Sequence, residues 1–389
     1  MPLKPSQLLS CLQDKQAEFR HFDHRAFALL HQYRSALAEA ANHPFLELPT
    51  QFSSHDGGNL GAFPLEPNHL FPHWVIPCQL TWGNREQSLQ WVRGLLTGIK
   101  TFAVDGSQIS PGKDLSIPVA LVQVGWFENL HLPSGGYTKD IQLDVLTPSD
   151  LKVSHDQLVE GVVSAHRFQL ETQRLVDYMN EHHNDPNCLV FFDGSLVPSF
   201  AEKWDVELSD RYVSSLKKLI ATSERTQVPL VAYVDTSHAR DLTVMLEQVM
   251  NLPEAPSIQD AQLLDPLMKW GDRTLLFQCR RSGILSHFHE QQGDITFTYL
   301  KSTREGYPAR LEFPRWIIES GRLNQVIDWI RGELIIGNGY PYVIETADQA
   351  AVLKAEDRQT FYRILQDWAE EQELKLRFSR KMVSKTRRR

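Results

Sequence analysis

The sequence predicts an α/β protein built on a sheet that contains at least some parallel strands. Short apolar segments alternate along the chain with segments of helical periodicity, and this alternation is typical of strands joined by crossover helices. Three of the apolar segments end in an aspartate, at Asp105, Asp193 and Asp235. Because open α/β sheets bind ligands beyond the carboxyl ends of their strands, these aspartates indicate a candidate site.

The first 97 residues predict a helical N-terminal region followed by an extended arm. From Leu8 to Ala41, apolar residues recur with a period near 3.6, and the segment contains neither Pro nor Gly. Residues 43–85 are rich in Pro, Gly, Ser and Asn, which favours a long loop or an extended arm. We therefore expect three parts in the chain, which are residues 1–97, a main domain over residues 98–374 and a basic tail over residues 375–389.

The main domain begins with three expected strands and a long helix. The first segment, GIKTFAVDGSQ, is apolar up to Asp105, where we expect the strand to end and a turn to begin. The Val-rich segment IPVALVQVGWFEN and the segment KDIQLDVLTP predict the second and third strands. A helix is expected over residues 154–183, because Ser154 is a suitable N-cap and apolar residues recur on one face.

Two further strands end in aspartate and alternate with helices. The segment NCLVFFDGSL predicts a strand that ends at Asp193, and VPLVAYVDTS predicts one that ends at Asp235. A helix over residues 208–224 is expected between them. The remaining expected elements are strands at TFTYLKS and ARLEFP, a helix over residues 322–335, the GNGYPY loop, and a helix or helix pair over residues 343–374.

Charge, cysteine content and hydropathy narrow the class of protein. The net charge of −8 excludes a polycation that binds nucleic acid by bulk attraction, although residues 375–389 carry eight Lys or Arg and no acid. That tail is either a solvated, disordered segment or a contact to phosphate groups. The four cysteines form no CxxC pair, which favours reduced thiols over a disulfide framework or a zinc site.

The hydropathy pattern contains no membrane or secretion signal. No apolar run approaches the roughly 20 residues that span a bilayer. The first 20 residues also lack the basic, apolar and small-residue regions of a signal peptide. We therefore expect a cytoplasmic protein without a membrane partner.

The aspartates that follow the strands favour metal chemistry. Asp105 and Asp193 each begin a DGS triplet, in which Gly106 and Gly194 are expected to let the backbone turn sharply. A single aspartate after a strand more often caps a turn or helix, but two copies in one fold make that explanation weaker. Clustered carboxylates repel each other unless a cation or proton intervenes, and oxygen ligands suit Mg²⁺ or Mn²⁺. Such ions activate water and neutralise phosphodiesters, so phosphodiester hydrolysis is the expected reaction.

Glu171 is the best further candidate ligand, because it lies on the helix that precedes the Asp193 strand. Arg167 is four residues earlier and shares its helical face. From the residues alone, a surface ion pair between these two side chains is the simpler explanation. Glu160, on the same helix, competes for the role of ligand.

The segment GNGYPYVIETADQAA predicts a turn followed by a helix. Gly337 and Gly339 allow the turn, and Tyr340 and Tyr342 can stack or form hydrogen bonds. A connector with core aromatics is the alternative. Asp348 is expected near the start of the following helix, where it could be an ordinary cap.

In this order, the motifs resemble the NurA nuclease family. The resemblance covers roughly residues 98–370, and although each motif alone is weak, the two DGS triplets together with GYPY are fairly specific. The matching pieces are AVDGSQ at 103–108, Arg167 with Glu171, LVFFDGSL at 189–196, VAYVDTSHARDL, DAQLLDPL, ARLEFP, GNGYPYVIETADQAA, and Asp357 with Arg358.

The resemblance implies an RNase H-like mixed sheet flanked by helices and a Mn²⁺-dependent (or Mg²⁺-dependent) DNA nuclease. It also implies a homodimer that works with a hexameric HerA-type translocase in DNA end resection, as a probable exonuclease of DNA repair. Carried over by position, Asp105, Glu171 and Asp193 would be metal ligands, and Tyr340 would be the active-site tyrosine.

One position departs from the family. The family usually has an Ala-His pair where this chain reads Ala347-Asp348. A carboxylate can replace an imidazole as a ligand of Mg²⁺ or Mn²⁺, but it cannot act as a base with a pKa near 7. Asp348 is therefore either a fourth catalytic and metal-binding carboxylate or the mark of a catalytically weakened subunit that only binds DNA or the translocase. A phosphatase with a nucleophilic aspartate is disfavoured, because the first motif reads VDGS rather than DxD.

Overall fold

The computed structural model describes residues 3–41, 60–67, 70–113, 115–151, 159–197, 205–281, 295–377 and 379. The chain divides into two compact units. Unit 1 comprises Met1–Leu80, Asp235–Ser282 and Thr296–Leu311, and unit 2 comprises Thr81–Val234, Gly283–Ile295 and Glu312–Arg389. The division at residues 97 and 374 remains a prediction about separate domains. The predicted cap Ser154 and the basic end of the tail lie outside the described residues.

Unit 2 is built on a mixed sheet with the strand order β5-β4-β3-β6-β7. Strands β3, β4 and β5 are antiparallel, while β6 is parallel to β3 and β7 is parallel to β6. This arrangement confirms the predicted RNase H-like mixed sheet. The strands are β3 (Lys100–Ile109), β4 (Ala120–Asn129), β5 (Tyr137–Leu146), β6 (Cys188–Asp193) and β7 (Leu230–Val234).

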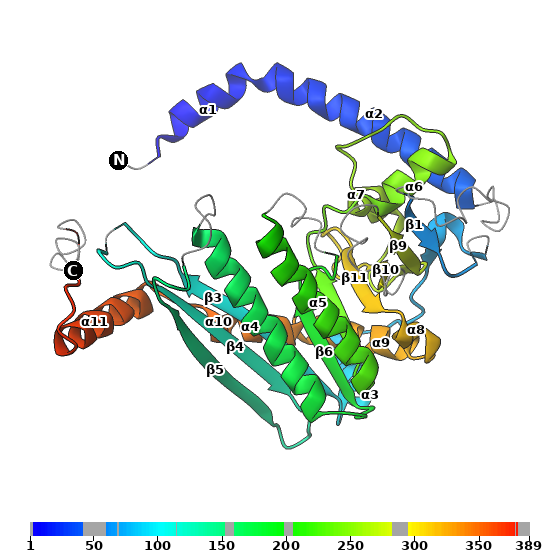
Figure 1. Ribbon diagram of the computed structural model, residues 1–389. Coiled ribbons are helices and arrows are strands. Elements are labelled where there is room, and N and C mark those ends of the chain that lie inside the picture. The colour runs from blue at the N-terminus through cyan, green and yellow to red at the C-terminus, as the bar shows by residue number, and fades with distance from the viewer. Residues whose placement is uncertain are drawn as a thin grey trace. The chain divides into compact units, whose positions relative to one another are not determined.

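Helices lie on both faces of this sheet. In Figure 1, α4 and α5 lie in front of the strands of unit 2 and α10 lies behind them. On α4, most of the predicted apolar stripe is buried, with Val163, Leu175 and Met179 fully enclosed, while Val159 at its start is exposed. Phe168 of α4 stacks on Tyr212 of α5 with 4.4 Å between ring centroids. The helices of unit 2 are α3 (Arg85–Leu96), α4 (Val159–Glu181), α5 (Val206–Thr226), α8 (Trp316–Glu319), α9 (Leu323–Ile336), α10 (Tyr342–Ala351) and α11 (Ala355–Glu371).

Unit 1 combines helices with short antiparallel strands. Strand β9 pairs with β1 and β10, and β8 pairs with β2 and β10. Its elements are α1 (Pro5–Asp14), α2 (Gln16–Ala41), β1 (Gly61–Pro64), the 3₁₀ helix η4 (Pro72–Trp74), β2 (Val75–Ile76), α6 (Asp241–Val249), α7 (Asp260–Leu264), the 3₁₀ helix η6 (Asp265–Leu267), β8 (Arg273–Thr274) and β9 (Phe277–Arg280). The strands β10 (Ile295–Leu300) and β11 (Ala309–Pro314) include residues of both units.

A buried ion-pair network holds part of unit 1 together. The Asp241 carboxylate is 2.6 Å from Arg281 Nε and 2.7 Å from Arg310 Nη1. Asp241 and Arg310 are both almost fully buried. Each neutralises the charge of the other, which would be costly to bury alone. Although burial alone raises the pKa of Asp241, the two guanidinium groups lower it to about 2. Asp241 therefore stays ionised inside the protein.

The predicted arm over residues 43–85 is partly wrong. Among its described residues, 61–64 and 75–76 are β-strands that pair with β9 and β8. These strands are short, and their hydrogen-bond partners lie about 200 residues away in the sequence, so local composition did not reveal them. The helix α3 over Arg85–Leu96 was also not anticipated. In contrast, the predicted helices over residues 208–224 and 322–335 are confirmed as α5 and α9.

The described residues include no helix long and apolar enough to cross a membrane. The cysteines Cys11, Cys78, Cys188 and Cys279 are all free thiols, as the sequence predicted.

Candidate active site

Asp105 lies in the middle of β3 and not at its end. The strand continues to Ile109, and Asp105 pairs with Gly125 of β4 across the antiparallel ladder. The predicted turn at Gly106 is therefore wrong. The physical reason is that β4 supplies hydrogen-bond partners along all of β3, so the glycine stays in the strand and serves a steric purpose instead.

Gly106 provides the space that lets Glu171 reach β3. A Cβ atom on residue 106 would lie 2.3 Å from Glu171 Oε1 and 2.9 Å from Arg167 Cγ. Arg167 Nη1 donates a hydrogen bond to the Gly106 carbonyl oxygen at 2.7 Å and lies 3.1 Å from Glu171 Oε1. Only 13% of the Glu171 side chain is exposed, so the simple surface ion pair is excluded. Glu160, the competing candidate, is exposed in the first turn of α4.

Asp193 is the last residue of β6, as predicted, and its side chain is exposed. Gly194 has a φ of 137°, so here the glycine does allow a sharp change of backbone direction. The fully buried Glu312 stabilises this turn, because it accepts hydrogen bonds from Leu196 N at 2.6 Å and Ser195 Oγ at 2.9 Å. The carboxylate of Asp193 is therefore presented from a fixed turn.

Tyr340 reaches Asp193 from the GNGYPY loop. Its hydroxyl group donates a hydrogen bond to Asp193 Oδ2 at 3.4 Å. The ring packs edge-on against Tyr233 of β7, with 5.4 Å between the centroids. Tyr340 and Asp193 thus lie together although 147 residues separate them in the sequence.

Asp348 lies in the second half of α10, so its predicted place near the start of a helix is wrong. The helix begins at Tyr342, directly after Pro341, and continues to Ala351. Gly125 lets α10 approach the sheet, because a Cβ atom there would lie 2.7 Å from Ala351 N. Asp348 thereby comes close enough to Asp105 to contribute to the raised pKa of that carboxyl group.

The carboxyl groups of the site influence one another strongly. Burial raises the pKa of Asp105 to about 6, helped by the hydrogen bond to Asp348 and by the negative charges of Asp193 and Asp348, while a hydrogen bond from the Gly106 backbone opposes the shift. Burial also raises the pKa of Glu171 to about 8, with Arg167 opposing and the charges of Asp105 and Asp193 contributing. The ionised forms of Asp105 and Glu171 are thus disfavoured in this site.

The donor set suits a hard divalent cation. Its donors are carboxylate oxygens, the ligand type that Mg²⁺ and Mn²⁺ accept. Glu171 Oε1 is buried without a hydrogen-bond partner of good geometry, so it has coordination capacity to spare. As the side chains lie, no three His, Cys, Asp or Glu residues of the described ranges are grouped closely enough to hold an ion. The type of donor atom fits a divalent cation, but the side chains would have to rotate to complete its coordination.

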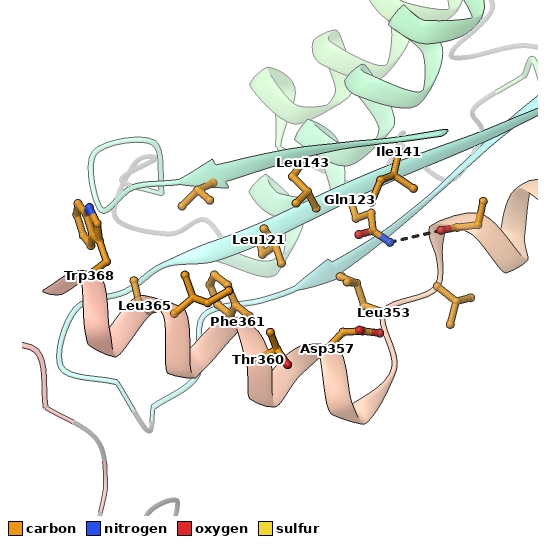
Figure 2. Close-up of a pocket in the computed structure, with 14 residues that line it drawn as sticks. Leu121, Gln123, Ile141, Leu143, Leu353, Asp357, Thr360, Phe361, Leu365 and Trp368 are labelled. Carbon is orange, nitrogen blue, oxygen red and sulfur yellow. Dashed lines mark hydrogen bonds between the residues drawn. The ribbon is translucent and has the colours of Figure 1, made fainter. Parts of the chain in front are cut away.

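A separate apolar cavity of about 750 Å³ lies between β4, β5 and α11 (Figure 2). Leu121, Leu143 and Phe361 are among the residues that line it, and Asp357 is its one acidic group. Gln123 at its border donates a hydrogen bond to the Ala351 carbonyl oxygen at 2.9 Å and so ties the end of α10 to β4. The cavity lacks clustered polar groups, so it is not the candidate active site.

Among the solved structures that are similar to this chain, three illustrate the likeness, all at low sequence identity. The NurA nuclease from Sulfolobus solfataricus is 14% identical, over 74% of this chain and 92% of that chain, with a TM-score of 0.48. NurA bound to dAMP and manganese is 11% identical, over 71% of this chain and 91% of that chain, with a TM-score of 0.41. The catalytic domain of human endonuclease V is 13% identical, over 72% of this chain and 96% of that chain, with a TM-score of 0.34.

Sequence comparison with curated proteins gives no significant match. The family model of the NurA domain, however, matches residues 99–353, which is about two thirds of the chain and includes Asp105, Glu171, Asp193, Tyr340 and Asp348. With the predicted motifs in their expected order and the RNase H-like sheet in place, the chain belongs to the NurA family of nucleases.

Proposed function

We propose that this protein is a divalent-metal-dependent deoxyribonuclease that hydrolyses phosphodiester bonds. The observation that carries the proposal is the proximity of acidic groups to Asp105 and Glu171, whose pKa values are raised by burial and by the charges of Asp193 and, at Asp105, of Asp348. Such clustering is costly unless a cation neutralises it. In this proposal, Asp105, Glu171 and Asp193 are metal ligands and Asp348 is a fourth.

Each residue of the proposed site has a distinct task. A bound Mn²⁺ or Mg²⁺ would neutralise charge on the phosphodiester and lower the pKa of a water molecule. Arg167 holds Glu171 through the 3.1 Å ion pair and anchors it to the Gly106 carbonyl oxygen. Tyr340 orients the Asp193 carboxylate through its hydroxyl group, which can also turn towards a phosphate oxygen.

Because position 348 carries an aspartate and not a histidine, the groups that can gain or lose a proton in this site are different. Burial raises the pKa of Asp105 and the neighbouring Asp348 raises it further, so the Asp105 carboxyl group holds a proton more readily than usual while no cation is bound. We propose that this proton leaves when a cation binds, because metal ligands must be deprotonated. Asp348 then contributes negative charge rather than a neutral donor.

The alternative function is a catalytically weakened subunit that binds DNA or a partner without cleaving. Two observations favour it, which are the carboxylate at Asp348 and the absence of a preformed group of three metal ligands among the described residues. Asp105 lies on β3, Glu171 on α4 and Asp193 on β6, the strand that pairs with β3. The presence of all three carboxylates favours the catalytic proposal.

The assembly and cellular role extend the same proposal. We propose that the protein acts as an exonuclease on DNA ends during resection, as a homodimer coupled to a HerA-type translocase in the cytoplasm. The support for these assignments is membership of the NurA family. The proposal includes contacts made by residues 1–97 and 375–389 in this assembly.

The decisive experiment measures degradation of end-labelled linear single- and double-stranded DNA with Mn²⁺, Mg²⁺ or EDTA. Asp105→Ala, Glu171→Ala and Asp193→Ala should abolish cleavage. Glu160→Ala is the matched control for Glu171→Ala, because Glu160 lies on the same helix and is exposed, so this variant should cleave like wild type. A wild-type protein that stays inactive with both metals, even beside a cognate translocase, would leave the binding subunit as the better account.

A further inference from the structure

Glu333 is a fully buried glutamate outside the candidate active site. It lies on α9, and none of its surface is exposed to solvent. A buried carboxylate is expensive unless several donors satisfy it, so its partners indicate why it is there.

The Glu333 carboxylate joins three other parts of unit 2. Its Oε1 accepts a hydrogen bond from Thr101 Oγ1 at 2.8 Å, and its Oε2 accepts one from the backbone N–H of Val343 at 3.1 Å. His131 Nε2 lies 3.1 Å from Oε1. Burial alone would lower the pKa of His131, but the Glu333 carboxylate raises it, so the pair stabilises the protonated form of the imidazole.

These partners lie on the two elements whose carboxyl groups meet. Thr101 is on β3, four residues before Asp105, and Val343 is in the first turn of α10, five residues before Asp348. Glu333 therefore links the beginning of β3 to the first turn of α10. A carboxylate at a helix N-terminus is also favourable, because it meets unpaired N–H groups and the positive end of the helix dipole.

We propose that Glu333 is a positioning residue that fixes α10 against β3 and thereby places Asp348 beside Asp105. The inference rests on the proposed nuclease function for its kinetic test, but the placement of α10 can be measured without activity. Glu333 touches none of the candidate metal ligands in the contacts described above, so it acts through the backbone of α10 and the hydroxyl group of Thr101.

Glu312 offers a matched control for Glu333. It is equally buried and also accepts one backbone N–H, from Leu196, and one hydroxyl hydrogen bond, from Ser195. It holds the turn after Asp193 instead of α10. Glu312→Gln and Glu333→Gln therefore make the same chemical change at the same burial, but only the second removes an anchor of α10.

The test is a double-mutant cycle between Glu333→Gln and Asp348→Ala. Glu333→Gln should lower kcat about 10- to 100-fold with little change in KM for DNA, because small misplacements of catalytic groups have effects of this order. In the Glu333→Gln background, Asp348→Ala should then lower kcat by less than about a further 3-fold, because the effects of coupled residues are not additive. In the Glu312→Gln background, Asp348→Ala should keep its full effect.

Thr101→Val is a second variant that serves if Glu333→Gln does not fold. It removes only the hydroxyl anchor on β3 and keeps the shape of the side chain, so it should show the same loss of coupling to Asp348 in weaker form. Equal effects of Asp348→Ala in the wild-type, Glu333→Gln and Thr101→Val backgrounds would overturn the proposal. So would an Asp348→Ala single variant that cleaves like wild type.

Hydrogen–deuterium exchange separates failure of this inference from failure of the proposed function. The amides of α10 should exchange faster in Glu333→Gln than in wild type, and they should be unaffected in Glu312→Gln. This result would support the positioning role even for a protein that cleaves no DNA. Unchanged exchange of α10 in Glu333→Gln would refute the role even for an active nuclease.

Discussion

Gly106→Ala is the sharpest test of how the candidate active site is built. The substitution adds one carbon atom, 2.3 Å from Glu171 Oε1 and 2.9 Å from Arg167 Cγ. Ordinary van der Waals contact begins near 3.4 Å, so the Glu171 carboxylate must retreat by about 1 Å. Such a displacement of a catalytic group costs about 100-fold in rate. Overpacking of this kind costs about 1–3 kcal/mol of stability.

Two measurements separate these effects. Single-turnover cleavage of end-labelled DNA at saturating Mn²⁺ gives the rate, and urea denaturation gives the free energy of unfolding. Gly94→Ala on α3 is the control, because no atom lies within 4 Å of the added carbon. It should leave the rate unchanged and stabilise the helix by about 0.5–1 kcal/mol. A Gly106→Ala protein that cleaves within about twofold of wild type would refute the reasoning, because a 1 Å shift of a true ligand cannot be that harmless.

Three further predictions follow from other parts of the molecule. Asp241→Asn should destabilise the protein by about 3–5 kcal/mol in urea titrations, since Arg310 then stays buried without its counter-charge. Because the folded-state pKa of Asp241 is lowered to about 2, its contribution is present above the unfolded pKa near 4 and is lost as the pH falls towards 2; acid titrations should show this loss in wild type and not in Asp241→Asn. Millimolar Mn²⁺ should raise the melting temperature of wild type by mass action but not that of Asp193→Ala, and equal shifts in both would place the ion elsewhere. Tyr340→Phe should lower kcat at least about tenfold while the melting temperature stays near that of wild type, because the ring keeps its packing on Tyr233 and loses only the hydroxyl group; an unchanged kcat would remove Tyr340 from the mechanism.

The sequence predicted the succession of strands and helices along the chain better than the geometry of the candidate site. Asp193 lies at a strand end, as expected, because the apolar run NCLVFF needs a buried strand and the following glycine needs a turn. Arg167 and Glu171 share a helical face because the helical period requires it. Both inferences depend on local chemistry, which a single sequence contains.

The remaining features depend on partners that are distant in the sequence. Asp105 lies inside β3 because β4 extends the ladder past it, and nothing in the motif VDGS indicates that pairing. Asp348 reaches Asp105 because Gly125 lets α10 approach, a contact between segments more than 200 residues apart. An isolated glycine in an apolar strand can signal such a close approach, so Gly125 is a local signal of this contact. Glu333 had no comparable signal, because it lies among ordinary helix residues.

The two glycines on β3 and β4 have a consequence for how this site can vary. Gly106 leaves room for a carboxylate on one helix, and Gly125 leaves room for the backbone of another. The empty volume at these two positions is therefore part of the site, although neither residue has a functional group. Saturation mutagenesis should find both positions intolerant of every larger residue, because each added atom would collide with Glu171 or with the backbone of α10.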